Sequence, residues 1–236
     1  LSWSCHCLGR ALALALPQDN WIGQQLAEID PVAIFTVLQA FRRRLREVMH
    51  TELLAVYERN QPAGSYCYTA AAAGRRSLKN TCLGYLLTPA ADGRVAPDLL
   101  DLAQRQFAAA DNMTDRLASL RAIVNADRSA GDTLLAGFYQ EWQGDPLVVD
   151  KWLTLQALCT LPGTLERVKA LTAHPAFILK NPNKVRALIG AFCTGNQIGF
   201  HGAGGDGYAF LADYVIRLDP MNPQIAARQL TPLTTW

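Results

Sequence analysis

The sequence predicts an all-α protein in which antiparallel helix pairs stack as an α-solenoid. The 236-residue chain is rich in Ala and Leu, which favour helix, and no useful stretch alternates apolar and polar residues as a strand does. Four segments begin with Asp-Pro or Asn-Pro, and from residue 98 onward helical patterns alternate with short turns. Short helices joined by short turns are typical of antiparallel pairs, which indicates a degenerate HEAT- or armadillo-like array.

Four helices are predicted before residue 90. Residues 10–16 form a short apolar helix that a proline ends, and a second helix, capped by Asp19 or Asn20, carries apolar residues as far as position 29. The Asp-Pro pair at 30–31 opens the third, because the Asp oxygen accepts from free amides and proline has no amide to leave unpaired. That helix keeps a period close to 3.6, and the fourth covers residues 66–87.

Each later helix also has its own start signal. These signals are Pro97 or Asp98, the polar turn 111–115, Ser129 or Asp132, Asp145-Pro146, Thr164, Asn181-Pro182 and Asn222-Pro223. The glycine-rich stretch 202–207 is expected to be a flexible turn between two helices, since no strand precedes it as a dinucleotide-binding loop requires. We interpret residues 1–236 as a single elongated helical-repeat domain in which residues 1–11 stay unplaced.

Composition and charge disfavour several classes of partner. The net charge is only +2, so the arginines at 42, 43, 44 and 46 indicate a solvated helix face or a contact with a neighbouring domain rather than a nucleic-acid surface. No stretch reaches the roughly 18 apolar residues of a membrane span, and the apolar run after Arg10 is too short for a secretory signal. We expect no nucleic-acid or membrane partner. Because the chain begins with Leu rather than Met, it is expected to be a piece of something longer.

The six cysteines form no Cys-x-x-Cys pair. In a chain of this size, we expect buried thiols in a reducing, cytoplasmic compartment rather than a disulfide framework. The triplet Cys5-His6-Cys7 lacks the second pair of ligands that a tetrahedral zinc site needs. The sequence therefore predicts no metal or other cofactor in this chain.

Motifs that carry catalysis are also missing. None of the four histidines belongs to H-E-x-x-H, and the chain contains neither a phosphate-binding G-x-x-x-x-G-K-[ST] loop nor a G-x-S-x-G elbow. Cys193 follows an apolar helical stripe, which favours a core position over a nucleophile. Taken alone, the residues favour a non-catalytic helical module.

Several ordered stretches carry a resemblance to a known family. They are 28–33, 110–117, 147–152, 181–192, 200–201, 206–208 and 222–228, the clearest being NPNKVRALIGAF at 181–192. Together they resemble the C-terminal helical domain of bacterial-type aminopeptidase N, a zinc-dependent family that removes N-terminal residues from peptides. The resemblance runs from about residue 12 to about residue 233. It implies that the zinc ligands and the general base belong to a separate upstream catalytic domain.

The resemblance also implies a role for three side chains. In the family this domain caps the catalytic domain and encloses the substrate chamber; Arg186 and Arg228 match arginines that face the chamber, and Gln224 matches a glutamine near the bound peptide. Gln224 and Arg228 are four residues apart and share a helix face, and a guanidinium can bind a peptide carbonyl or carboxylate through several donors. The alternative is that each arginine pairs with a surface acid.

Three functions are therefore weighed. The first is a non-catalytic domain of a metallo-aminopeptidase, with the catalytic domain and a peptide as partners and no activity of its own. The second is an independent helical-repeat scaffold that binds another protein. The third is an unrecognised enzyme that acts alone.

Overall fold

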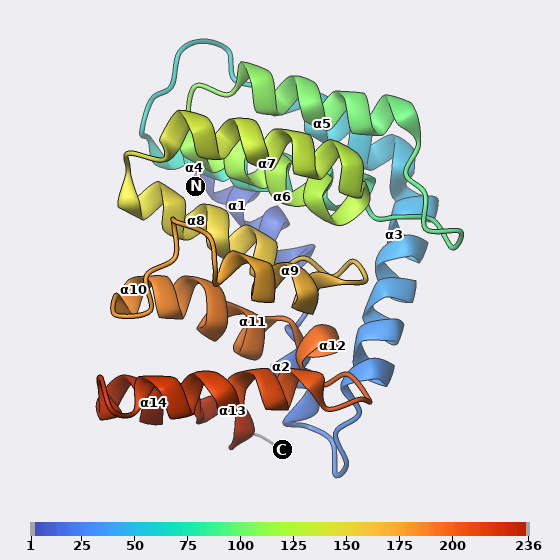
Figure 1. Cartoon of the computed structure of the whole chain (residues 1–236). Coiled ribbons are helices and arrows are strands. Elements are labelled where there is room, and N and C mark those ends of the chain that lie inside the picture. Colours follow the sequence, from blue (N-terminus) through green and yellow to red (C-terminus); the bar gives the residue numbers. More distant parts are fainter. Residues whose placement is uncertain (1–2, 235–236) are drawn as a thin grey trace. The chain divides into compact units, whose positions relative to one another are not determined.

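The computed structural model describes residues 3–234, with side chains from residue 7, and every regular element in that part is a helix (Figure 1). The all-α prediction is confirmed. Contacts divide the chain into an N-terminal unit, residues 3–17 and 37–134, and a C-terminal unit, residues 18–36 and 135–234. Whether the chain forms a single domain stays a prediction.

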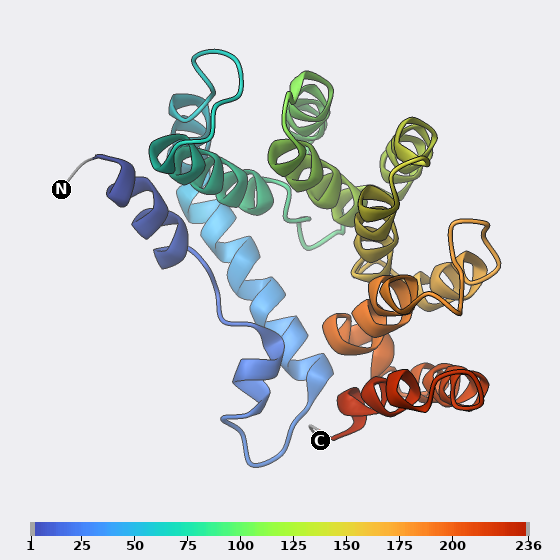
Figure 2. The ribbon, with the colours of Figure 1, turned by 90° about the vertical axis from the view of Figure 1, so that its left-hand side faces the viewer.

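The N-terminal unit contains five helices and the first turns of α7. They are α1 (Trp3–Ala13), most of α3 (Pro31–Arg59), α4 (Ala70–Leu86), α5 (Pro97–Ala109), α6 (Met113–Ala126) and the start of α7 (Arg128–Trp142). Helix α1 packs along α4, and α6 packs against both α4 and α5. Figure 2 shows α1, in dark blue, beside the teal α4.

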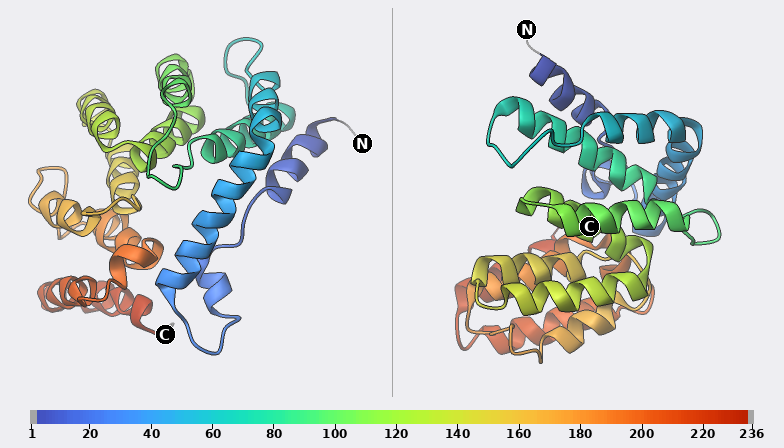
Figure 3. Two further views of the ribbon diagram at one scale, coloured as in Figure 1. Left: turned by 90° about the vertical axis from the view of Figure 1, so that its right-hand side faces the viewer. Right: turned by 90° about the horizontal axis from the view of Figure 1, so that it is seen from above.

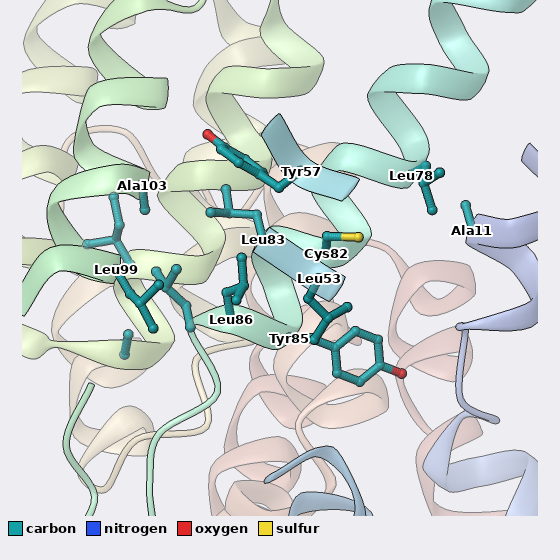
Figure 4. Packing of buried hydrophobic residues seen from close by; sticks show 13 residues of the cluster. Ala11, Leu53, Tyr57, Leu78, Cys82, Leu83, Tyr85, Leu86, Leu99 and Ala103 are labelled. Atoms are coloured by element: carbon teal, nitrogen blue, oxygen red, sulfur yellow. The ribbon is translucent and has the colours of Figure 1, made fainter. Parts of the chain in front are cut away.

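The core of this unit is centred on α4. Cys82, Leu83 and Leu86 are completely buried, and they meet Leu53 of α3 and Leu99 of α5 (Figure 4). Each large apolar side chain that leaves water contributes about 1.5–3 kcal/mol. The apolar face of α4 therefore assembles the unit.

Helix α3 is less regularly buried than its apolar period predicts. Ile34 and Leu38 are buried, whereas Val37, Phe41 and Val48 are exposed. Met49 departs from helical geometry, with φ −111° and ψ 19°, so the helix bends there. The arginines of this helix have structural uses: Arg46 Nη1 donates to the Thr88 carbonyl at 2.5 Å, and Arg44 lies 3.5 Å from Glu47 in an exposed ion pair.

A buried polar cluster, the Asp115 cluster, joins α4, α5 and α6. Lys79 Nζ lies 2.9 Å from Asp115 Oδ2, and the two side chains are only 2% and 4% exposed. Asn80 Nδ2 donates to Asp115 Oδ1 at 2.8 Å, and Gln106 Nε2 donates to Asn80 Oδ1 at 2.9 Å. Asn112 caps α6 by accepting from the Asp115 backbone N–H at 2.9 Å. Both buried charges therefore have close partners.

The C-terminal unit is a series of shorter helices. Besides α2 (Asp19–Gly23) and the adjoining parts of α3 and α7, they are α8 (Pro146–Ala157), α9 (Thr164–Leu171), α10 (Pro182–Val185), the π-helical η1 (Arg186–Gly190), α11 (Ala191–Gly195), α12 (Gln197–Phe200), α13 (Asp206–Leu218), α14 (Pro223–Gln229) and the 3₁₀ turn η2 (Thr231–Leu233). Helix α8 packs against α9 and η1, and α13 packs against α14. In the left view of Figure 3 these helices, yellow to red, follow one another in layers.

One buried amide fixes the centre of this unit. Asn196, 1% exposed, donates through Nδ2 to the carbonyls of Ala157 and Cys159 at 3.0 and 2.8 Å. Its Oδ1 accepts from Gly199 N at 3.0 Å and so caps α12. Asn20 Nδ2 lies 3.5 Å from the Thr194 carbonyl, which brings α2 to the same region.

The four helix starts on Asp-Pro or Asn-Pro are confirmed. Asp30, Asp145, Asn181 and Asn222 each accept a backbone N–H two or three residues further on, at 2.9 to 3.2 Å. Proline occupies the first helical position in each case. These caps satisfy amide groups that have no partner inside the helix.

Three other predicted start signals were wrong. Neither Asp19 nor Asn20 caps α2, because both lie inside the helix and the residue before it, Gln18, forms no side-chain cap hydrogen bond. Helix α7 is capped by Asp127, whose Oδ1 accepts from Ala130 N at 2.8 Å, and not by Ser129 or Asp132. Thr164 does not cap α9, because its hydroxyl donates to the Leu161 carbonyl at 2.7 Å. The residue before α9 is instead Gly163, at φ +80°, a backbone conformation that favours glycine.

The boundaries of three predicted helices were also wrong. Helix α1 spans Trp3–Ala13 rather than residues 10–16, and α2 ends at Gly23 rather than near residue 29. The chain folds back after α2, since a Cβ added at Gly23 would lie 3.2 Å from Ile29 Cγ2. Helix α4 begins at residue 70 instead of 66, because the Tyr66 N–H is held by Asp111 Oδ2 at 2.7 Å outside the helix.

The glycine-rich stretch 202–207 connects α12 to α13, as predicted, and brings them very close. Gly205 has φ +73°. A Cβ added at Gly207 would lie 2.2 Å from the Phe200 carbonyl oxygen. The hydroxyl of Tyr208 lies 2.6 Å from Nδ1 of the buried His201, and burial lowers the pKa of that imidazole to about 4.

We predict that Asp115→Ala destabilises the protein by about 3–5 kcal/mol, because it leaves the Lys79 ammonium buried without its counter-charge. Denaturant unfolding measures the loss. Lys169→Ala is the control, because its exposed pair with Glu166, at 2.9 Å, is screened by water and contributes little to stability. Equal losses in the two variants would contradict the prediction.

Gly207→Ala is expected to cost about 1–3 kcal/mol or more, because the new methyl group would overlap the Phe200 backbone. Thermal unfolding checks it. The matched control is Gly137→Ala in α7, where an added Cβ meets nothing within 4 Å and a helical alanine stabilises by about 0.5–1 kcal/mol. A neutral Gly207→Ala would show that the two helices can separate without cost.

Acid should weaken the fold through His201. Its folded pKa of about 4 lies below the ordinary value of 6.5, so between these values the unfolded state binds more protons. Stability from this group is complete above pH 6.5 and is lost as the pH falls towards 4. Melting temperatures of the protein and of His201→Gln, compared from pH 7.5 to 4, should diverge over that window; parallel curves would refute the assignment.

Candidate substrate-contact site

The three residues predicted to contact substrate all lie in the C-terminal unit. Arg186 is the first residue of η1, and Gln224 and Arg228 lie on α14. All three side chains are exposed. Their positions are set by the two helices that carry them.

Arg186 lies on a helix that runs through α10, η1 and α11 with a π turn in the middle. Val185, Leu188, Ile189 and Phe192 of this helix are completely buried, so its apolar stripe faces the unit's interior and Arg186 lies outside it. Arg186 Nη1 donates to Asn183 Oδ1 at 3.3 Å. This contact lies on the exposed side of the helix.

Side chains from outside the π turn satisfy its carbonyls. Thr154 of α8 donates through Oγ1 to the Ala187 carbonyl at 2.9 Å, and the Thr194 hydroxyl donates to the Gly190 carbonyl. A π turn replaces the bonds of an α-helix with i→i+5 bonds, and such turns often occur at functional sites. The hydroxyl of Thr154 therefore supports the non-standard geometry beside Arg186.

A second, partly buried ion pair fixes the start of this helix, with the Asp150 side chain 20% exposed. Lys184 Nζ lies 2.7 Å from Asp150 Oδ1 and donates to the Pro146 carbonyl at 3.0 Å. Lys184 is 5% exposed. Together with the Asn181 cap, this pair holds the first turn of the helix against α8.

The last residue of α14, Gln229, lies next to Gly190, the last residue of the π turn. A Cβ added at Gly190 would lie 3.4 Å from Gln229 Oε1 and 3.8 Å from Arg186 Cγ. Gln229 is 9% exposed, whereas Gln224 and Arg228 are exposed residues one helical turn apart. The segments that carry the three predicted residues are therefore neighbours.

The alternative in which each arginine pairs with a surface acid is not observed. Within residues 3–234, neither Arg186 nor Arg228 forms an ion pair with a carboxylate. A guanidinium carries five N–H donors, and the one described side-chain bond of Arg186 is that from Nη1 to Asn183. The site is thus a cationic surface rather than an internal salt-bridge network.

Sequence reasoning missed two residues that shape this site, Thr154 and Gln229. Thr154 is 33 positions from its partner Ala187. No spacing rule joins residues so far apart. Their roles become visible only when α8 and α14 are placed beside η1.

The cysteines and candidate metal ligands show no reactive arrangement. Cys193 is completely buried, and burial raises the pKa of its thiol to about 12, so it stays protonated at neutral pH. Cys82 and Cys159 are also buried. Cys67 is exposed, so the prediction of a buried thiol was wrong for this residue. In the described part of the chain no three His, Cys, Asp or Glu side chains gather to hold a metal ion. Cys5 and His6 lie outside the described side chains.

No helix among residues 3–234 combines the length and apolar character that a membrane span requires.

Comparison with known proteins gives a consistent relationship. The family model described as "Domain of unknown function (DUF3458_C) ARM repeats" matches residues 8–236. The chain is 39% identical over 221 residues to aminopeptidase N of Escherichia coli K12, and 38% identical over 229 residues to aminopeptidase N of Caulobacter vibrioides. These matches cover 93% and 96% of this chain but 25% and 26% of the relatives.

A solved structure agrees with the sequence matches. The crystal structure of Legionella pneumophila aminopeptidase A in complex with aspartic acid superposes with a TM-score of 0.87 at 30% identity, covering all of this chain and 28% of that one. The chain thus spans about a quarter of the length of its relatives. The ARM-repeat description confirms the predicted α-solenoid class, and the chain belongs to this DUF3458_C family, the C-terminal helical domain of aminopeptidase N-like enzymes.

Proposed function

We propose that this chain is a non-catalytic domain that caps the zinc-containing catalytic domain of an aminopeptidase N-like enzyme, encloses its substrate chamber and contacts the peptide. The parent enzyme removes N-terminal residues from peptides. The observation that carries the proposal is the pair of exposed arginines without carboxylate partners, on adjacent segments of a chain that matches part of aminopeptidase N.

The chemistry of the three residues suits a peptide. Arg186 and Arg228 can bind a backbone carbonyl or a terminal carboxylate through charge-assisted hydrogen bonds. Gln224 offers both a donor and an acceptor, which matches the two groups of a peptide bond. Contacts that are equally strong in the bound peptide and in the transition state lower KM without raising kcat.

Zinc belongs to the rest of the proposed enzyme. The side chains described in this chain do not fit a zinc site, because no three suitable ligands lie together. The catalytic domain is therefore the proposed principal partner and the peptide the second. We also propose a cytoplasmic location, which is supported by the free thiols of Cys7, Cys67, Cys82 and Cys193.

In the intact enzyme, Arg228→Ala and Arg186→Ala should each raise KM for peptides of three or more residues by about ten- to a hundredfold, because each removes a hydrogen bond to a charged group worth about 1.5–3 kcal/mol. Zinc content, measured by atomic absorption, should not change. Arg217→Ala is the matched control, since Arg217 is exposed in the same unit and stacks 4.7 Å from the Tyr214 ring. Unchanged kinetics over several peptide lengths would contradict the assigned contacts.

Two further outcomes separate this function from its alternatives. The purified chain alone should not cleave peptides, and chelator-resistant cleavage by it would favour an enzyme that acts alone. A stable protein partner recovered without the catalytic domain, together with unchanged kinetics of the arginine variants, would favour a scaffold.

A further inference from the structure

The N-terminal unit contains a pocket that the proposed function does not use. It has a volume of about 540 Å³ and lies between α1, α3 and α4. Val56, Ala71 and Leu78 provide its apolar wall, and Figure 4 shows Leu78 on the side of α4 that faces α1. The volume falls within the roughly 300–1,000 Å³ of small-molecule sites.

The pocket is bordered by three arginines, one from each helix. Arg10 comes from α1, Arg59 from α3 and Arg75 from α4. All three are exposed residues, and none of the described side chains that line the pocket is acidic. Three cations therefore surround an apolar space that contains no countercharge of its own.

Among the described residues, few of the N–H donors of these three arginines form hydrogen bonds within the protein. Arg59 Nε donates to the Ala55 carbonyl at 3.1 Å. Among the described residues, no carboxylate forms an ion pair with any of the three. Like charges gathered at one place repel one another, and an anion placed among them relieves the repulsion.

The other polar groups that line the pocket already have hydrogen-bond partners. Cys7 Sγ lies 3.7 Å from Asn60 Oδ1, and Asn60 Nδ2 donates to the Val56 carbonyl at 2.7 Å. These groups satisfy each other or the backbone. The ligand preference is therefore set by the apolar wall and the three guanidinium groups.

We propose that this pocket binds a small carboxylate on an apolar stem. The stem would lie against Val56, Ala71 and Leu78, and the carboxylate would take charge-assisted hydrogen bonds from the arginines at the rim. A medium-chain fatty acid and the carboxyl end of an apolar peptide both have this chemistry. The site is separate from Arg186, Gln224 and Arg228, so its test does not depend on the proposed peptidase role.

The experiment is calorimetric titration of the full chain with four probes. Octanoate represents a fatty acid and N-acetylphenylalanine a peptide end, whereas octylamine has the opposite charge and sulfate has no apolar stem. We expect at least one of the two carboxylates to bind about tenfold or more tightly than both octylamine and sulfate. The tighter of the two carboxylates shows whether the ligand comes from a fatty acid or from a peptide end. Octylamine or sulfate binding as tightly as the better carboxylate, or no binding of either carboxylate, would overturn the proposal.

Variants locate the binding within the protein. Arg59→Ala combined with Arg75→Ala should weaken the better carboxylate about tenfold or more, and Ala71→Phe should abolish binding by filling the pocket. The Arg121→Ala variant changes an exposed arginine of α6 that does not line the pocket. It should bind the carboxylate as tightly as the unsubstituted chain does. Circular dichroism confirms that each variant folds; if Ala71→Phe does not, Arg75→Glu replaces it. Unchanged affinity in the double arginine variant would refute the site.

Discussion

Satisfying backbone groups at buried helix ends is the constraint on which this structure depends. Helices share no ladder of hydrogen bonds with one another, so side chains must join them. Asn196 does this most completely, because its buried amide donates to two carbonyls at the end of α8 and its oxygen caps α12. Thr154 plays the same part for the π turn, and the Asp115 cluster joins three helices of the other unit. Apolar burial supplies most of the stabilisation, and these polar contacts fix how the helices meet.

Local chemistry made the helix starts predictable, and long-range contacts explain the errors. Asp or Asn followed by Pro combines a capping oxygen with a proline at the first helical position, so the four predicted starts of this kind were correct, although Asp219-Pro220 follows α13 and opens no helix. The start of α4 depends on Asp111, 45 residues beyond Tyr66, and the end of α2 depends on Ile29 returning to Gly23. Asp127 was overlooked because several polar residues lie close together in this segment and each could cap a helix. Only the folded backbone shows that Asp127 accepts the hydrogen bond.

The sequence proposed the residues of the candidate site but could not give their geometry. The family resemblance identified Arg186, Gln224 and Arg228, and helical spacing placed two of them on one face. One π turn cannot be distinguished from an α turn by apolar spacing, since both leave Val185, Leu188, Ile189 and Phe192 inside. The contact between Gln229 and Gly190 could be found only in the folded structure. The arginines at 10, 59 and 75 likewise gave no signal, because a cluster assembled from three helices has no pattern along the chain.

The C-terminal unit draws residues 18–36 from far upstream, and this has a consequence for synthesis on the ribosome. Asn20 is made 174 residues before its partner Thr194. At about 5–20 residues per second, the segment waits roughly 9–35 s before the helices that receive it exist. The intervening chain contains nearly all of the N-terminal unit, which can form first. Residues 18–36, with Trp21 and Leu26 exposed even in the finished fold, are therefore the part of the nascent chain with most to gain from a chaperone.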